Sequence, residues 1–219
     1  MSRINAIYGT GGFAREVIPI LNEQHPNDDN IFVVHKEYLT SEKSINGYSV
    51  MSYEDFIDIP SKEKSITVAI SDASIRCRVS SVINQDGIRQ SSIISNKSVM
   101  MDEVSISNGA IICPFVTITS NIRVGQNFHA NIYSYVAHDC IIGDNVTFAP
   151  SVKCNGNVII EDNVYIGTGA IIKQGKSNNP IILGANSIIS AGSFVTRNVQ
   201  ESTTVHGNPA KILSKSSIK

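Results

Sequence analysis

A six-residue repeat of apolar positions is the feature of this 219-residue chain that most restricts its fold. Steps of six from Ile94 to Ile172 reach fourteen positions, and all fourteen are apolar. Because 42% of the chain is apolar, such a run is improbable by several orders of magnitude. A helix would repeat at about 3.6 residues and a lone strand at about 2. The repeat therefore predicts short strands that turn at regular corners, as in a parallel β-helix.

A second inward position follows four residues after each of these, and it is small or apolar from Val104 to Ala170. The series breaks at Lys176, slips by five residues and resumes at Leu183, so we expect an outward loop there. Glycine and asparagine cluster at the predicted corners, where left-handed backbone angles suit them, as at residues 143–145. The two inward positions of each hexad would stack into an apolar column that one coil alone could not sustain.

The first ninety residues follow a different pattern, in which short apolar runs alternate with helical stretches. This alternation is typical of α/β architecture. Strands are predicted over residues 4–8, 31–34 and 66–70, and a helix over residues 73–84. Pro19 is expected to kink the helix that follows the first strand, or to mark an irregular turn.

Charge and hydropathy argue against several classes of protein. Eighteen Lys and Arg residues face nineteen Asp and Glu residues, so no basic excess would attract nucleic acid or an anionic membrane. No stretch reaches the roughly 18 apolar residues that span a bilayer, and the first residues lack a signal-peptide core. The four cysteines never form C-x-x-C, so neither a zinc knuckle nor a redox pair is suggested. We expect a cytoplasmic protein.

A glycine-rich loop follows the first predicted strand. Its pattern of Gly9, Gly11 and Ala14 fits the dinucleotide fingerprint in form, since glycines let a phosphate approach the start of a helix. A nicotinamide cofactor would also need an acidic residue at the end of the second strand, where the chain has His35 and Lys36. Bound NAD is therefore not expected.

Three segments resemble the hexapeptide-repeat acyltransferases, specifically the sugar acetyltransferases of the PglD and NeuD type. They are YGTGGFAREV at residues 8–17, VAHDCIIG at 136–143 and GNPAK at 207–211. The resemblance covers nearly the whole chain, and it implies a homotrimer with acetyl-coenzyme A in the groove between subunits. It also implies three regions: an α/β Rossmann-like domain at residues 1–92, an all-β left-handed parallel β-helix at 93–213, and a C-terminal tail at 214–219.

Acetyl transfer needs a neutral nucleophile, because a protonated amine attacks a thioester poorly. His138 takes the third place of its hexad, so the repeat points it outward, and an imidazole can accept the proton. Resemblance to a His-Glu pair makes His138 the general base and Asp139 its supporting carboxylate. Gly156 matches the family position near the thioester, where a backbone N–H would stabilise the oxyanion. No Ser or Cys is paired with a His in a recognised motif, which favours direct transfer.

The resemblance also assigns binding residues. The coenzyme would contact Gly156, Thr168, Ala191, Pro209 and Lys211, whereas the nucleotide-linked sugar would contact Gly9, Thr10, Gly11, Gly12 and Asn131. Structural corner roles are the alternative for Gly156, Thr168 and Ala191. One close family pattern has a histidine where Phe13 stands and an acidic pair after the second strand, so the nucleotide base and the sugar stay open.

The sequence predicts an acetyl-CoA-dependent N-acetyltransferase without a metal, acting on the C4 amine of a nucleotide-linked amino-dideoxy sugar for surface polysaccharide synthesis. The nearest alternative is an O-acetyltransferase of sialic acid or a related sugar. A carbonic anhydrase on this scaffold would need three histidines from neighbouring coils, whereas only His129 and His138 lie in regular hexads. A non-catalytic trimeric scaffold that binds a ligand is the third alternative.

Overall fold

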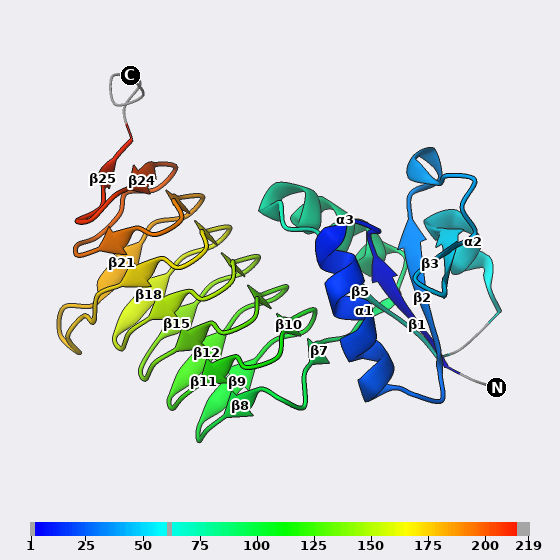
Figure 1. Cartoon of the computed structure of the whole chain (residues 1–219), viewed down its shortest axis with the longest axis horizontal. Coiled ribbons are helices and arrows are strands. Elements are labelled where there is room, and N and C mark those ends of the chain that lie inside the picture. Colours follow the sequence, from blue (N-terminus) through cyan, green and yellow to red (C-terminus); the bar gives the residue numbers. More distant parts are fainter. Residues whose placement is uncertain (1–2, 61–62, 214–219) are drawn as a thin grey trace. The chain divides into compact units, whose positions relative to one another are not determined.

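A computed structural model describes residues 3–60 and 63–213 of the chain (Figure 1). The chain divides into two compact units, Met1–Ser95 with Asn108–Ile111, and Asn96–Ser107 with Ile112–Lys219. The predicted tail at residues 214–219 lies outside the described residues.

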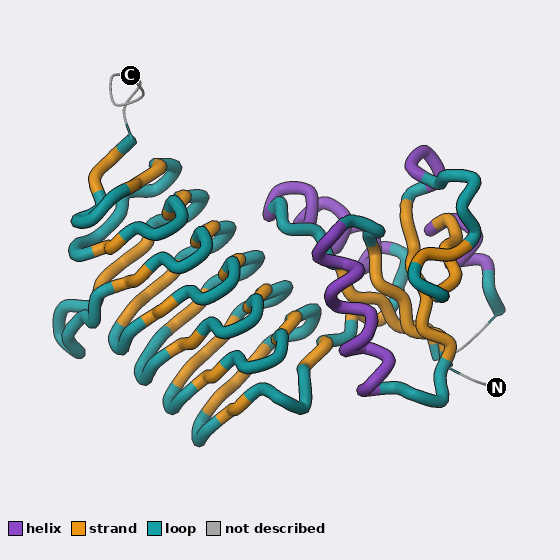
Figure 2. The backbone as a smooth tube through the Cα atoms, in the orientation of Figure 1, coloured by secondary structure: helices purple, strands orange, loops and turns teal. Residues whose placement is uncertain are grey.

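The first unit is the predicted Rossmann-like α/β fold, with a sheet in the order β3-β4-β2-β1-β5-β6 (Figure 2). Only β3 runs antiparallel to its neighbour. Because β2 and β5 flank β1 on opposite sides, the strand order reverses at the carboxyl end of β1, where α/β folds bind ligands. The elements are β1 (Ile4–Tyr8), α1 (Gly12–Gln24), β2 (Asp29–Val34), η1 (Lys36–Tyr38), β3 (Ser44–Ile45), β4 (Tyr48–Ser52), α2 (Tyr53–Asp58), β5 (Lys64–Val68), α3 (Ala73–Gln85), β6 (Arg89–Gln90) and β7 (Ile93–Ile94).

One local prediction differs from the structure. The strand expected over residues 66–70 is β5, which begins and ends two residues earlier. The buried Arg76 of α3 donates to the Ile70 carbonyl at 2.6 Å, so the end of the apolar run is bound by a helix side chain instead of extending the strand. Helix α1 continues past Pro19, which lies on its exposed face. The ring removes an N–H that would have bonded the carbonyl of Arg15, an exposed residue.

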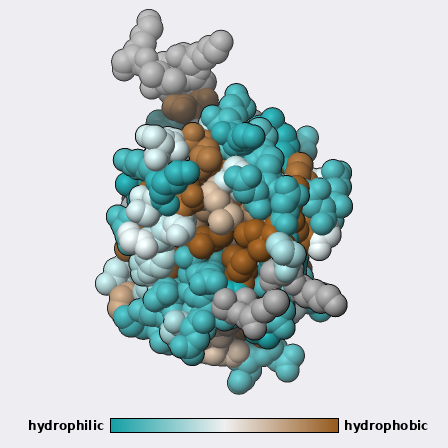
Figure 3. Space-filling view, turned by 90° about the vertical axis from the view of Figure 1, so that its right-hand side faces the viewer, coloured by the Kyte–Doolittle hydropathy of each residue, from teal (hydrophilic) through white to brown (hydrophobic). Residues whose placement is uncertain are grey.

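The helices within residues 3–60 and 63–213 are all too short or too polar to cross a bilayer. On the face drawn in Figure 3, hydrophobic side chains gather in a patch that hydrophilic side chains surround. The partly exposed apolar side chains of the first unit include Ile57, Ile75 and Val82.

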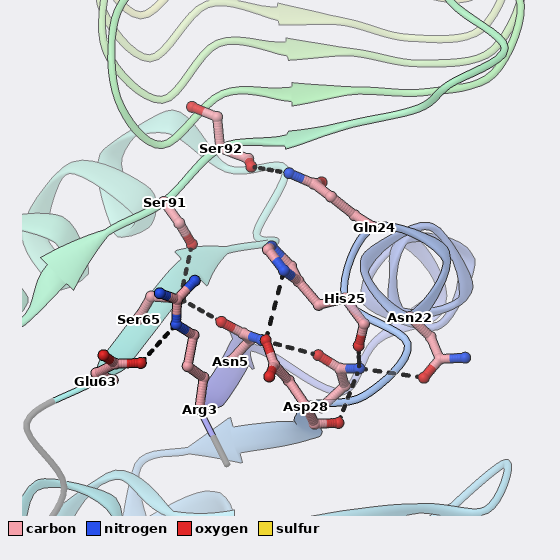
Figure 4. Close-up of polar contacts among 11 residues, drawn as sticks. Arg3, Asn5, Asn22, Gln24, His25, Asp28, Glu63, Ser65, Ser91 and Ser92 are labelled. Carbon is pink, nitrogen blue, oxygen red and sulfur yellow. Dashed lines mark hydrogen bonds and ion pairs between the residues drawn. The ribbon is translucent and has the colours of Figure 1, made fainter. Parts of the chain in front are cut away.

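A polar network fixes the amino ends of the central strands (Figure 4). Asn5, buried in β1, donates to Asn30 Oδ1 at 3.2 Å and accepts from Ser65 Oγ at 2.9 Å. Arg3 and Glu63 form an exposed ion pair at 2.6 Å beside it. The buried amides and hydroxyl are thus hydrogen-bonded to one another. The glycine-rich loop lies at the other end of β1.

The second unit is the predicted left-handed parallel β-helix, in which short strands alternate with corner loops (Figures 1 and 2). Paired residues in the regular coils are eighteen positions apart, as for Thr117 and Tyr135, which equals three hexads. One sheet contains β10 (Ile111–Ile112), β13 (His129–Ala130), β16 (Thr147–Phe148), β19 (Tyr165–Ile166), β22 (Ile188–Ile189), β24 (Thr204–His206) and β25 (Lys211–Ile212). The second contains β8 (Val99–Met100), β11 (Thr117–Ile118), β14 (Tyr135–Val136), β17 (Lys153–Cys154), β20 (Ile171–Ile172) and β23 (Phe194–Val195). The third contains β9 (Val104–Ile106), β12 (Ile122–Val124), β15 (Ile141–Ile142), β18 (Val158–Ile160) and β21 (Ile181–Leu183).

The apolar column follows the hexad count. Every member of the first inward series from Ile112 to Ile172 is at most 4% exposed. Met100, in the opening coil, is 37% exposed, because a coil at the end of a stack pairs on one side only. The expected outward loop lies between β20 and β21, and the column resumes at the fully buried Leu183.

Candidate active site

His138 and Asp139 form a corner between β14 and β15, and their backbone is fixed by the two adjacent coils. The Asp139 N–H donates to the Ser120 carbonyl at 3.0 Å, and the His138 carbonyl accepts from the Asn157 N–H at 3.0 Å. Asp139 has a φ of 59°, a left-handed angle that a short polar side chain tolerates. The two side chains are 47% and 48% exposed, so the rigid corner holds them outward, as the repeat predicts.

The imidazole and the carboxylate are directly paired. His138 Nδ1 lies 2.7 Å from Asp139 Oδ2. The hydrogen bond from His138, and then one from Asn121, hold the pKa of Asp139 below its ordinary value, so this carboxyl is ionised at neutral pH. An ionised carboxylate only accepts hydrogen bonds, so Nδ1 carries a proton, and in the neutral imidazole Nε2 is then the acceptor. This arrangement is what a general base requires.

Gly156 lies one coil further on, against the imidazole. A Cβ at this position would come within 2.6 Å of His138 Nε2, so only glycine leaves room for the ring in this orientation. Among the hydrogen bonds of residues 3–60 and 63–213, the N–H of the buried Gly156 has no acceptor. A buried free N–H next to the base is a suitable donor for an oxyanion.

The cysteines at this corner point inward. Cys140 and Cys154 are fully buried, and Cys140 Sγ lies 3.3 Å from the Asn155 carbonyl. The hydrogen bond to Cys140, together with burial, raises the pKa of Cys154 well above its ordinary value, so it is a protonated thiol. The corner thus presents the His138 imidazole at its surface, with the unpaired Gly156 N–H beside it and these two thiols turned away.

Three of the residues predicted for binding lie at a different corner of the β-helix. Asn131 follows β13, Thr168 follows β19 and Ala191 follows β22, so all three lie between the first and second sheets. The backbone carbonyl of Thr168 accepts from the Gly192 N–H at 2.8 Å, a bond that joins successive coils at this corner. His138 and Gly156 lie between the second and third sheets. Within one chain, the structure does not bring the two groups together.

Pro209 and Lys211 line a cavity of about 470 Å³ at the C-terminal end of the β-helix. Arg197 lines it as well and adds a second cation. The sequence did not single out Arg197, because it lies in a corner without a motif. Two cations beside an open cavity suit an anionic group.

The glycine-rich loop opens α1 as the fingerprint predicts. Gly9 has a φ of +119°, and its N–H donates to the Val33 carbonyl at 2.8 Å. Within the described residues, no side chain caps the helix start at Gly11. A Cβ at Gly11 or Gly12 would meet nothing within 4 Å, so the space in front of the first helical turn is open. Thr10, between Gly9 and Gly11, is partly exposed. The loop leaves backbone N–H groups available to an anion.

A cavity of about 320 Å³ at the carboxyl ends of β1 and β2 was not predicted from the sequence. Aromatic and aliphatic side chains share its wall with one arginine, and the lining residues are Tyr8, His35, Tyr38, Tyr53, Ile75, Arg78, Val79, Val82 and Ile83. Burial, and then the charge of Glu54, raise the pKa of Tyr8, so its hydroxyl stays protonated at neutral pH. Two aromatic residues could have located this cavity from the sequence. Tyr8 ends β1 and His35 directly follows β2, beside the point where the strand order reverses.

Glu54 supplies a carboxylate at the end of β2, where the residues that directly follow the strand are His35 and Lys36. Its Oε1 lies 3.2 Å from His35 Nε2, and its Oε2 accepts from the Lys36 N–H at 3.0 Å. The residue comes from α2, so its position depends on how that helix packs. Among residues 3–60 and 63–213, no group of three or more His, Cys, Asp or Glu side chains is placed to hold a metal ion.

Comparison with known proteins identifies the family. Residues 6–83 match the PglD N-terminal domain, residues 121–156 match the bacterial transferase hexapeptide (six repeats), and residues 157–197 match the hexapeptide repeat of succinyl-transferase. The chain is 49% identical over 212 residues to a GDP-perosamine N-acetyltransferase of Escherichia coli O157:H7, covering 96% of each protein.

Solved structures agree over the same length. WeeI from Acinetobacter baumannii AYE superposes with a TM-score of 0.93 at 46% identity, covering 97% of this chain and 100% of WeeI. PerB from Caulobacter crescentus, solved in complex with CoA and GDP-perosamine, shares the fold with a TM-score of 0.85 at 23% identity, covering 96% and 97%. The chain therefore belongs to the PglD-type sugar acetyltransferases, the hexapeptide-repeat acyltransferases that carry an N-terminal Rossmann-like domain.

Proposed function

We propose that this enzyme is an acetyl-CoA-dependent N-acetyltransferase that acts on the C4 amine of a nucleotide-linked amino-dideoxy sugar, with GDP-perosamine as the first candidate. The observation that carries the proposal is the corner at which Asp139 holds the His138 ring against Gly156. The name of the 49% identical relative supports the choice of acceptor.

The reaction follows from the atoms at this corner. His138 Nε2 accepts a proton from the sugar amine while the amine nitrogen attacks the thioester carbonyl. The Gly156 N–H donates to the oxyanion of the tetrahedral intermediate, and Asp139 stabilises the imidazolium that has formed. When the intermediate collapses, the C–S bond breaks, and the leaving thiolate takes the proton from His138. The products are the acetamide and CoA, and no acyl-enzyme is formed.

The coenzyme site in this proposal lies between two copies of the chain in a homotrimer. Thr168 and Ala191 lie at one corner of the β-helix, whereas Gly156 lies at another. A groove between neighbouring β-helices would bring such corners together, and it would also bring Asn131 toward the His138 of the next copy. Lys211, with Pro209 beside it, would bind a phosphate of the coenzyme.

The first unit holds the nucleotide in this proposal. The pyrophosphate would lie at Gly9, Thr10, Gly11 and Gly12, where the start of α1 is open. The aromatic cavity beside Tyr8 would take the base, and Glu54 would accept from ribose or base donors. Because acetyl-CoA is a cytoplasmic metabolite, the proposal keeps the cytoplasmic location and the role in polysaccharide synthesis that the sequence predicts.

An acceptor screen tests the proposal. Purified enzyme and acetyl-CoA are mixed with GDP-perosamine, with UDP- and dTDP-linked 4-amino sugars, or with sialic acid, and thiol release and product mass are measured. We expect acetylation of a nucleotide-linked amine, with GDP-perosamine fastest. Acetylation of the hydroxyl acceptor alone would establish the O-acetyltransferase instead. Ligand binding without thiol release from any acceptor would establish a non-catalytic scaffold.

A further inference from the structure

Asn121 lies at the same corner as Asp139, one coil earlier, and no motif marks it. Its Nδ2 donates to Asp139 Oδ1 at 3.1 Å, while the other carboxylate oxygen is paired with His138. We propose that Asn121 is a positioning residue for the His138 general base and that it acts through Asp139. The inference rests on the proposed function, in which His138 accepts the proton.

Asp139 needs a second partner because its side chain is half exposed. The backbone of the corner is fixed by Ser120 and Asn157, so the remaining freedom lies in the side-chain torsions. A single hydrogen bond between exposed groups contributes little and leaves the carboxylate free to rotate. With one oxygen bound to Asn121 and the other to His138, the plane of the carboxylate is fixed, and so is the imidazole.

A competing cation lies in the same groove. Arg123 lines a groove of about 500 Å³ together with Asn121, Asp139 and Glu103. A guanidinium is a strong partner for a free carboxylate. Because Asn121 binds Oδ1 and His138 binds Oδ2, we expect Asn121 to keep Asp139 paired with the imidazole instead of turning toward Arg123.

Asparagine suits this position for two reasons. Asn121 has a φ of 60°, which asparagine tolerates better than most residues, and its N–H donates to the Asp102 carbonyl at 3.2 Å. Its amide supplies the donor that an ionised carboxylate requires. Glu103, at the same corner of the preceding coil with a φ of 56°, has no such donor.

A matched control exists at another corner. Asn163 has the same φ of 60° and donates to Asn186 Oδ1 at 3.2 Å in the coil that follows. The backbone angle and the side-chain hydrogen bond to the next coil are thus alike, but the acceptor is an amide instead of a carboxylate paired with a histidine. Asn163→Gly therefore measures the effect of losing such a hydrogen bond between coils by itself.

Steady-state kinetics give the first test, with the acceptor that the wild-type enzyme uses. Asn121→Gly keeps the left-handed backbone without strain and removes the amide. We expect kcat to fall by roughly 10-fold, with the KM for acetyl-CoA within about two-fold, because the loss lies in alignment. Asn121→Asp, which has the same size but places a second carboxylate beside Asp139, should lose at least as much. Asn163→Gly should keep kcat within about two-fold of wild type.

The protonation site of His138 gives a second test that needs no turnover. In the full chain labelled with ¹⁵N-histidine, the ring resonances assigned with His138→Ala should show the Nδ1–H form in wild type and in Asn163→Gly. Asn121→Gly should show a mixture of the Nδ1–H and Nε2–H forms.

The kinetic and the resonance measurements distinguish a failure of the proposed function from a failure of the role inferred for Asn121. If wild type acetylates none of the acceptors, the proposed function fails, and the ring resonances alone decide the role of Asn121. A kcat of Asn121→Gly within two-fold of Asn163→Gly would overturn the inference, and so would an unchanged Nδ1–H form. A large loss of kcat with an unchanged ring would also overturn it, because Asn121 would then act by another route.

Discussion

At the scale of single residues, the site depends on one ring held from two sides. Asp139 binds one edge of the His138 imidazole, and Gly156 leaves the space that the other edge occupies. The imidazole is therefore oriented without burial, since both side chains of the pair are about half exposed. Each contact can be removed separately, which gives two predictions.

Removing the proposed base should abolish most turnover. His138→Ala is expected to lower kcat by about 10²- to 10⁴-fold, the usual effect of losing a general base. Calorimetric affinity for CoA should stay close to wild type, because the ring does not bind the nucleotide end of the coenzyme. His25→Ala, which removes an imidazole of the first unit near Asp28, is the control and should keep full activity. Turnover of His138→Ala close to wild type would disprove its role.

Filling the space at Gly156 should displace the ring. A methyl group there would lie 2.6 Å from His138 Nε2, so Gly156→Ala must rotate the imidazole away from Asp139. We expect kcat to fall by about 10²-fold, with a thermal midpoint that stays within a few degrees. A crystal structure of the variant should show the broken Nδ1 contact. If the ring keeps its place and its rate, the close approach has no functional meaning.

At the scale of elements, α3 shows how a cap positions a helix beside the aromatic cavity. Asp72 Oδ1 accepts from the Ile75 N–H at 2.9 Å and from Ser74 Oγ at 2.6 Å. These bonds, the one from Ser74 first, hold the pKa of Asp72 below its ordinary value of 3.8. Arg78, Val79, Val82 and Ile83, which line the cavity, all come from this helix.

The cap gives a prediction with a definite pH dependence. Asp72→Ala should lower stability by about 1 kcal/mol at pH 7, as for other helix caps. Because the folded pKa lies below the unfolded one, the contribution of the carboxylate is complete above about pH 4 and is lost as pH falls through the folded pKa. The difference in thermal midpoint from wild type should therefore be constant from pH 7 to 5 and shrink below pH 4. Asp58→Ala, at the last position of α2, is the control. A difference that grows in acid would contradict the assignment.

At the scale of the whole molecule, the β-helix is a stack in which each coil contacts only its neighbours. Phe128 packs edge-on against Phe148 of the next coil, with ring centroids 5.1 Å apart, in the middle of the column. Val205 lies in β24, near the end of the stack. A cavity in the middle interrupts contacts on both sides, whereas one near the end affects only the last coils.

Hydrogen exchange can measure this difference. Phe128→Ala should cost about 3–5 kcal/mol and speed amide exchange throughout β10 to β23. Val205→Ala should cost roughly 1.6 kcal/mol, for two lost methyl groups, and speed exchange only around β22 to β25. If both substitutions speed amide exchange over the same set of strands, the column unfolds as one cooperative unit.

The repeat made much of this architecture predictable, because a period of six directly reports which side chains point inward. The same period predicts that His138 and Asp139 point outward, as they do. Asn121 was missed although it lies one coil, eighteen residues, before Asp139, the offset at which corner residues meet. Glu54 could not have been found in this way, because it reaches β2 through the packing of α2. Periodic contacts can be counted along the chain, whereas contacts between unrelated segments depend on tertiary packing.

The number of coils between His138 and the cavity at Pro209 and Lys211 sets the distance between them along the stack. Each coil adds about 4.8 Å along the stack, so this reach can change only in whole steps. Inserting a single hexad would not lengthen it cleanly, since every later side chain would move to the next face of the prism. On the proposed function, an acyl donor bound at that cavity places its thioester beside the imidazole only if the length between its bound end and the thioester matches this fixed span. The number of coils would then determine which thioesters the enzyme accepts.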